Sequence, residues 1–165
     1  MTDLVKVMGK LLDVQGNIQI PGIYDLVAPI SPEEEELYKT LHFSMSDIHD
    51  ATGSKTTVHE SASEALQHRW RLPSLSLHGI EGAFASPGFK TVIPAKVIGK
   101  FSIRIVPDME PKDVNDKVKA YVDKVFKELN SANTCVLKCG EGAKGSLIDF
   151  IKFLFAMMVI NSDCK

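Results

Sequence analysis

Residues 97–105 carry the pattern that most constrains the fold, a strict alternation of two kinds of side chain. Val97, Gly99, Phe101, Ile103 and Ile105 fall two residues apart. Lys100, Ser102 and Arg104 fall on the opposite face. Because successive side chains of a strand point to opposite faces of a sheet, the pattern predicts a strand with one buried face and one polar face.

The segments around this strand predict the rest of the fold. Residues 74–82 alternate in the same way, 92–95 favour a further strand segment broken off by a proline, and 134–139 favour one more strand. Apolar stripes at helical spacing predict helices over 3–12 and 111–129, and Ser31-Pro32 favours a capped helix over 31–41. Together they predict an α+β fold, an antiparallel sheet with helices packed on one face and a long insertion at 14–73.

Length and charge limit the classes of partner. A chain of 165 residues with 44% hydrophobic residues suits one domain. A formal net charge of −2 without a basic run argues against nucleic acid and membrane surfaces as partners.

The apolar stretch 147–160 is too short to span a bilayer and is interrupted by Asp149 and Lys152. Three cysteines and no leader-like N-terminus favour the cytoplasm.

Motifs that carry catalysis or bind metal are absent from the sequence. The five histidines form none of the usual ligand motifs, and for His59 and His68 a solvated surface position is the more common case. Cys135 and Cys139 lack a second pair at zinc-finger spacing. Neither a nucleophile elbow nor a phosphate loop occurs, because residues 140–146 do not match the required order.

Arg104, on the polar face of its strand, is the residue whose chemistry invites a binding role. Its guanidinium offers a planar fork suited to a carboxylate. A plain surface arginine is the more common alternative, and the residues alone leave both open. Thr91 is predicted to lie at the start of the preceding strand segment.

Two longer motifs carry a family resemblance. Residues 68–84, HRWRLPSLSLHGIEGAF, together with KTVIP at 90–94 and VIGKFSIR at 97–104, closely match stretches of the cytosolic nonspecific dipeptidases and carnosine dipeptidases. The chain resembles the lid and dimerisation domain of these aminoacylase-type two-metal peptidases over about residues 1–140.

The resemblance implies a function for the longer enzyme and roles for two residues. Such enzymes hold two zinc or manganese ions in a catalytic domain and form homodimers through the lid. The matched motifs imply that Arg104 binds the C-terminal carboxylate of a dipeptide substrate and that Thr91 reaches the active site of the neighbouring subunit. No catalytic residue and no metal ligand of the family falls in this chain, so we expect a fragment that is inactive alone. A stand-alone dimerisation module is the alternative.

Departures from the family pattern divide the chain. The family's lid begins with a strand carrying H-S-G-x-x-G-G, which is absent, and Glu141 replaces a family histidine in residues 140–146. Beyond Phe150 the resemblance ends. We therefore expect a lid domain at 1–145, lacking its first strand, and a divergent apolar tail at 146–165. An incomplete gene product and a deliberately short isoform both fit this division.

Overall fold

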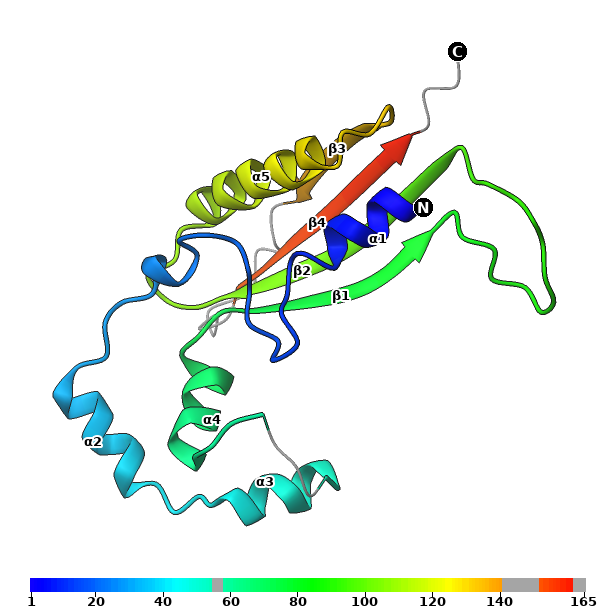
Figure 1. Cartoon of the computed structure of the whole chain (residues 1–165). Coiled ribbons are helices and arrows are strands. Elements are labelled where there is room, and N and C mark those ends of the chain that lie inside the picture. The colour runs from blue at the N-terminus through cyan, green and yellow to red at the C-terminus, as the bar shows by residue number, and fades with distance from the viewer. Residues whose placement is uncertain (55–57, 141–151, 162–165) are drawn as a thin grey trace.

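A four-stranded antiparallel sheet forms the centre of the computed structural model, which describes residues 1–54, 58–140 and 152–161. The strand order is β1-β2-β4-β3, and each neighbouring pair is antiparallel. The strands are β1 (Ser74–Glu81), β2 (Lys96–Ile105), β3 (Thr134–Gly140) and β4 (Lys152–Asn161). Figure 1 shows them as one twisted sheet.

Two helices, α1 (Thr2–Met8) and α5 (Pro111–Glu128), cover one face of this sheet (Figure 1). The predicted stripe of α5 is buried, including Val114, Val118 and Val122. Gly99 of β2 allows α1 to approach closely, because a Cβ atom there would lie 2.6 Å from Sδ of Met8. The predicted α+β class, with helices on one face of an antiparallel sheet, is confirmed.

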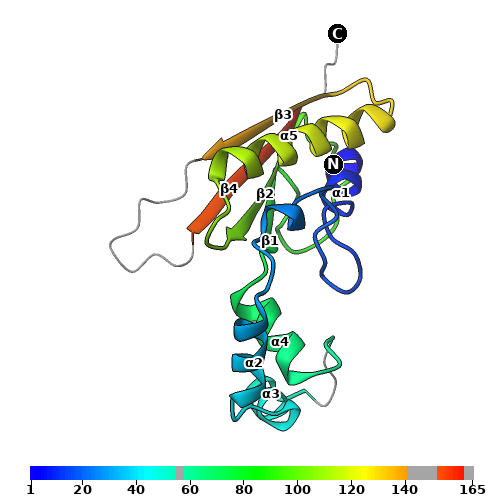
Figure 2. The same ribbon diagram turned by 90° about the vertical axis from the view of Figure 1, so that its left-hand side faces the viewer.

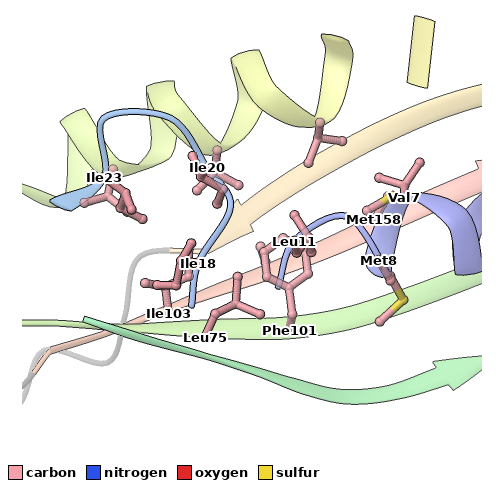
Figure 3. Close-up of a cluster of buried hydrophobic side chains, with 14 of the residues drawn as sticks. Val7, Met8, Leu11, Ile18, Ile20, Ile23, Leu75, Phe101, Ile103 and Met158 are labelled. Carbon is pink, nitrogen blue, oxygen red and sulfur yellow. The ribbon is translucent and has the colours of Figure 1, made fainter. Parts of the chain in front are cut away.

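The hydrophobic core lies between the sheet and these helices. Leu11, Phe101, Ile103 and Met158 are at most 1% exposed. The segment after α1, which ends in the short 3-10 helix η1 (Tyr24–Leu26), adds further buried isoleucines to the same cluster: Ile18, Ile20 and Ile23. Figure 3 shows these side chains pointing into one space between α5 and the sheet.

Three short helices of the insertion form a separate lobe at one end of the sheet. They are α2 (Pro32–Thr40), α3 (Met45–Thr52) and α4 (Ala62–Trp70), and Figure 2 shows them away from the core. Within these three fully described helices only Leu66 is buried. Local caps and an ion pair from Arg71 Nε to Glu34 Oε1, at 2.8 Å, therefore contribute much of the lobe's order.

Strand β4 comes from the segment predicted to be a divergent tail. It pairs along ten residues with β2, from Lys96↔Asn161 to Ile105↔Lys152, and along seven with β3. Ala156, Met158 and Ile160 turn into the core. The tail's apolar character is thus explained by burial in the sheet, while the proposed division at residue 145 stays a prediction.

The segment before β2 differs from the sequence expectation. Residues 82–95 form no strand, and β2 begins at Lys96 as one continuous strand. Pro94 has no backbone N–H for a ladder, so the alternation at 92–95 does not produce pairing. No helix in the described part of the chain has the length and apolar run needed to cross a membrane.

Candidate functional site

Arg104 lies near the end of β2 that faces the helical lobe. Its Nη2 donates to the carbonyl oxygens of His68 at 3.0 Å and Leu72 at 3.1 Å. Burial, followed by the charge of Arg69, lowers the pKa of Arg104 below its ordinary value, and the group remains a cation at neutral pH. The side chain therefore ties β2 to the end of α4, a partnership that the sequence pattern did not indicate.

The Nε atom of Arg104 is buried and has no hydrogen-bond partner among the described residues. A buried donor without an acceptor costs about 1–3 kcal/mol. Side-on binding of a carboxylate to a guanidinium uses Nε together with Nη2, and both N–H groups of Nη2 already donate to the carbonyls of His68 and Leu72. In this arrangement the side-on edge of Arg104 is therefore buried against the end of α4.

Thr91 lies in the exposed loop of residues 82–95 that joins β1 to β2. Figure 1 shows this loop projecting from the end of the sheet opposite the lobe. The loop ends at Lys96, eight steps along β2 before Arg104, and a strand rises about 3.3 Å per residue, so Arg104 lies roughly 26 Å from this end of the loop. An extended dipeptide spans only about 7 Å. Thr91 and Arg104 of one chain cannot contact the same dipeptide.

Gly82 fixes the direction in which this loop leaves β1. Its φ is 87°, a conformation that favours glycine. A Cβ atom at this position would lie 2.4 Å from the carbonyl oxygen of Lys96. The start of the Thr91 loop therefore depends on a residue without a side chain.

A serine and a histidine meet on the open face of the sheet. His78 Nε2 and Ser102 Oγ are 2.7 Å apart, at the irregularity where the β1–β2 register shifts. Ser102 is only 3% exposed, so its hydroxyl is poorly placed to attack a substrate. The neighbouring cavity of about 590 Å³ is lined by His78, Lys100, Lys138 and Met157, among others. The pair is best understood as a satisfied hydrogen bond between strands.

His59, Glu64 and His68 come together at α4, which the sequence analysis missed. One ligand atom from each lies within 4.8 Å of the other two. The two imidazole rings stack with centroids 4.3 Å apart. Glu64 and His68 are four residues apart on one helix, a spacing that places both on the same face. With residues 62–70 predicted as a helix, this spacing would have indicated that Glu64 and His68 lie close together.

The described residues do not fit a two-metal catalytic centre. Such a centre needs two sets of ligands and ions about 3.5–4 Å apart. His59, Glu64 and His68 are the one group of three potential ligands found in the described part of the chain, and they suffice for a single ion. The described residues therefore lack the two ligand sets that such catalysis needs.

Comparison with known proteins identifies the fold. A family model described as "Peptidase dimerisation domain", of the M20 peptidases, matches residues 20–130. The chain belongs to this family. This chain is 56% identical to the Cys-Gly metallodipeptidase DUG1 of Candida albicans over 133 residues. It is 42% identical to the human Beta-Ala-His dipeptidase over 164 residues.

Solved structures agree with the assignment. The structure of human carnosine dipeptidase 1 superposes with a TM-score of 0.76 at 46% identity, over 81% of this chain and 28% of that one. The dipeptidase Dug1p of Saccharomyces cerevisiae gives a TM-score of 0.74 at 52% identity, over 79% of this chain and 27% of that one. The resemblance inferred from the motifs is confirmed.

The chain spans about a third or less of the relatives it matches. The match covers 81% of this chain and 27% of the Candida albicans protein, and 98% of this chain and 32% of the human protein. The M20 dimerisation domain is therefore present here as one part of what its relatives contain. The names of both relatives identify dipeptidases, and that of the Candida albicans protein a metallodipeptidase.

Proposed function

We propose that this M20 dimerisation domain serves a metal-dependent dipeptidase as its lid and as the surface through which a homodimer forms. The family match over residues 20–130, with relatives named as dipeptidases, carries the proposal. In the whole enzyme two zinc or manganese ions, held outside the described residues, would supply the hydrolytic chemistry. We extend the proposal to a cytoplasmic location, because three cysteines are too few for the disulfide framework of a small secreted domain.

Within that enzyme, Arg104 binds the C-terminal carboxylate of the dipeptide. The match of its motif to the family and its planar guanidinium on the polar face of β2 support this role. Thr91 reaches the active site of the other subunit, in accord with the position of its loop at the end of β2 away from Arg104. Each active site would then use Arg104 from one chain and Thr91 from its partner.

A chimera tests the proposal. The 133 residues that match the Candida albicans dipeptidase replace the corresponding segment of that enzyme, and hydrolysis of Cys-Gly is measured with zinc or manganese. We expect metal-dependent turnover by a dimeric chimera. A chimera that folds and dimerises but hydrolyses no dipeptide with either metal would refute the proposed function.

Arg104→Ala in the active chimera tests the carboxylate role. Losing a charged contact to substrate should cost about 2–4 kcal/mol in the transition state, roughly a 30- to 1,000-fold fall in kcat/KM. Arg104→Lys should rescue only part of this, because an ammonium lacks the planar fork. The matched control is Arg71→Ala, which breaks the ion pair to Glu34 and should leave kcat/KM near normal.

Arg104→Ala also removes two hydrogen bonds to backbone carbonyls. We expect it to lower the free energy of unfolding by about 1–3 kcal/mol. Kinetics should therefore be measured well below the melting temperature of the variant. Near-normal kcat/KM in a folded Arg104→Ala chimera would show that the residue only joins β2 to α4.

A stand-alone dimerisation module is a second candidate, supported by one observation. Strand β4 pairs with both β2 and β3, so the described core is built from the chain's own elements. Light scattering on the chain alone, and mixed with a full-length relative, tests this function. Self-association or a mixed complex is expected, whereas strictly monomeric elution in both samples would exclude it.

A further inference from the structure

The segment leading into α4 places three side chains with metal-binding groups side by side. His59 precedes the helix, and Glu64 and His68 follow within it at a spacing of four residues. The Nδ1 atom of His59 lies 3.9 Å from Oε1 of Glu64. All three side chains are partly buried, so they are shielded while still open to a small ion.

We propose that His59, Glu64 and His68 form a binding site for one divalent cation of the Zn²⁺ class. A tetrahedral ion with ligands at about 2.1 Å needs ligand atoms roughly 3.4 Å apart. The ligand atoms of the three side chains lie within 4.8 Å of one another. Rotations of these side chains that move the atoms by about an ångström would therefore bring them to tetrahedral spacing. Two histidines and one carboxylate leave a fourth position for water.

The carboxylate of Glu64 is already oriented for this role. Its Oε2 accepts a hydrogen bond from the backbone N–H of Glu60 at 3.0 Å. The backbone N–H of Glu64 itself donates to Oγ of the N-cap Ser61 at 3.1 Å. The cap thus fixes the first turn of α4 and leaves Oε1 directed at His59. Outer hydrogen bonds of this kind hold a ligand in place and strengthen metal binding.

The ligand types of the cluster favour an ion of the late first row. Burial, followed by the nearby His59, lowers the pKa of His68 below its ordinary value, while Glu64 opposes the shift. Imidazole nitrogen together with carboxylate oxygen suits zinc and its late first-row neighbours better than magnesium or calcium.

An ion at this site would close the segment before α4 onto the face of the helix. The lobe has few buried side chains, so one such link would add substantially to its order. The carbonyl of His68 also accepts from Arg104, so the same helix end meets β2. The inference does not rest on the proposed peptidase function, and its test needs no catalysis.

Titration of the tag-free chain with Co²⁺ and then Zn²⁺ tests the site. Cobalt absorption reports the ligand type, because thiolate ligands give charge-transfer bands that imidazole and carboxylate do not. Competition of Zn²⁺ with a chromogenic chelator gives the affinity. The variants are His59→Ala, Glu64→Gln and His68→Ala, and the matched control is His42→Ala, an exposed histidine between α2 and α3.

We expect one equivalent of metal without thiolate bands. Each of the three variants should weaken Zn²⁺ binding by more than about 10-fold, since even outer-shell changes cost 10- to 100-fold. The control should stay within about twofold, and circular dichroism should show that each metal-free variant is folded. Absence of binding, thiolate bands, or equal affinity of the His68→Ala and His42→Ala proteins would each overturn the site.

Discussion

The packing of β4 can be tested at one buried methionine. Met158 is fully buried and pairs with Gly99 of β2 and Leu137 of β3. Its neighbour Met157 points to the opposite, open face and is partly exposed. The two residues have the same chemistry and are adjacent in the chain. Truncating each to alanine therefore separates burial in the core from strand propensity.

The expected magnitude follows from burial. Met→Ala in a packed core costs about 2–5 kcal/mol through lost transfer energy and the cavity that remains. Taking about 3 kcal/mol for Met158→Ala, and a urea dependence of about 2 kcal/mol per molar, the unfolding midpoint should fall by roughly 1.5 M. Met157→Ala should cost less than about 1 kcal/mol, because it leaves little cavity. Met158→Leu keeps the volume and should cost less than about 1.5 kcal/mol.

Urea unfolding followed by circular dichroism measures all three variants against the parent chain. A chain in which residues 152–161 lie outside the sheet would show equal, small effects at both methionines. That result would refute the central position of β4. Failure of Met158→Ala to fold, with Met158→Leu folded, would instead agree with it.

Three further predictions concern single side chains. Gly99→Ala should lower the free energy of unfolding in urea by about 1–3 kcal/mol, because the added Cβ would lie 2.6 Å from Met8 Sδ. Gly79→Ala is the control: its Cβ would meet no atom within 4 Å, so the free energy of unfolding should hardly change. Hydrogen bonds from Ser131 and Asn133 lower the pKa of Asp3 below its ordinary value of 3.8. The ionised carboxylate therefore stabilises the fold above that pH, and this stabilisation is lost as the pH falls through the lower pKa of the folded state. Asp3→Asn should have a smaller free energy of unfolding than the parent at pH 6, and the difference should shrink below about pH 4. Burial raises the pKa of Cys135 to about 11. Iodoacetamide at pH 8 should therefore alkylate this thiol slowly in the native chain and rapidly in urea, which peptide mass spectrometry can measure. Equal alkylation rates in the two conditions would contradict this prediction.

Local patterns predicted most elements because each reflects a local cause. Alternation at 97–105 marks the two faces of β2, and the stripe at 111–129 marks the buried face of α5. Ser31 accepts from the N–H of Glu34 at 3.1 Å, as expected for a capped helix. The expected strand at 92–95 was wrong, because a strand needs a partner and proline offers the ladder no donor.

The candidate sites depended on contacts that local patterns do not contain. Alternation placed Arg104 on the polar face of β2, but not against the carbonyls of His68 and Leu72, which lie more than thirty residues earlier. Glu64 and His68 share a helix face by spacing alone. The approach of His59 to them required the loop that leads into α4 to fold back along it.

By itself, the sequence determined which residues face a core, the α+β class and the motifs of the M20 dimerisation domain. Each of these depends on residue identity and short-range spacing. The tertiary structure alone decided that residues 152–161 enter the middle of the sheet. The apolar run of eight residues at 153–160 suits a helix, a strand or an exposed tail equally well. Residues 152–161 form a strand because the backbone groups of β2 and β3 need hydrogen-bond partners and because Met158 fills space in the core.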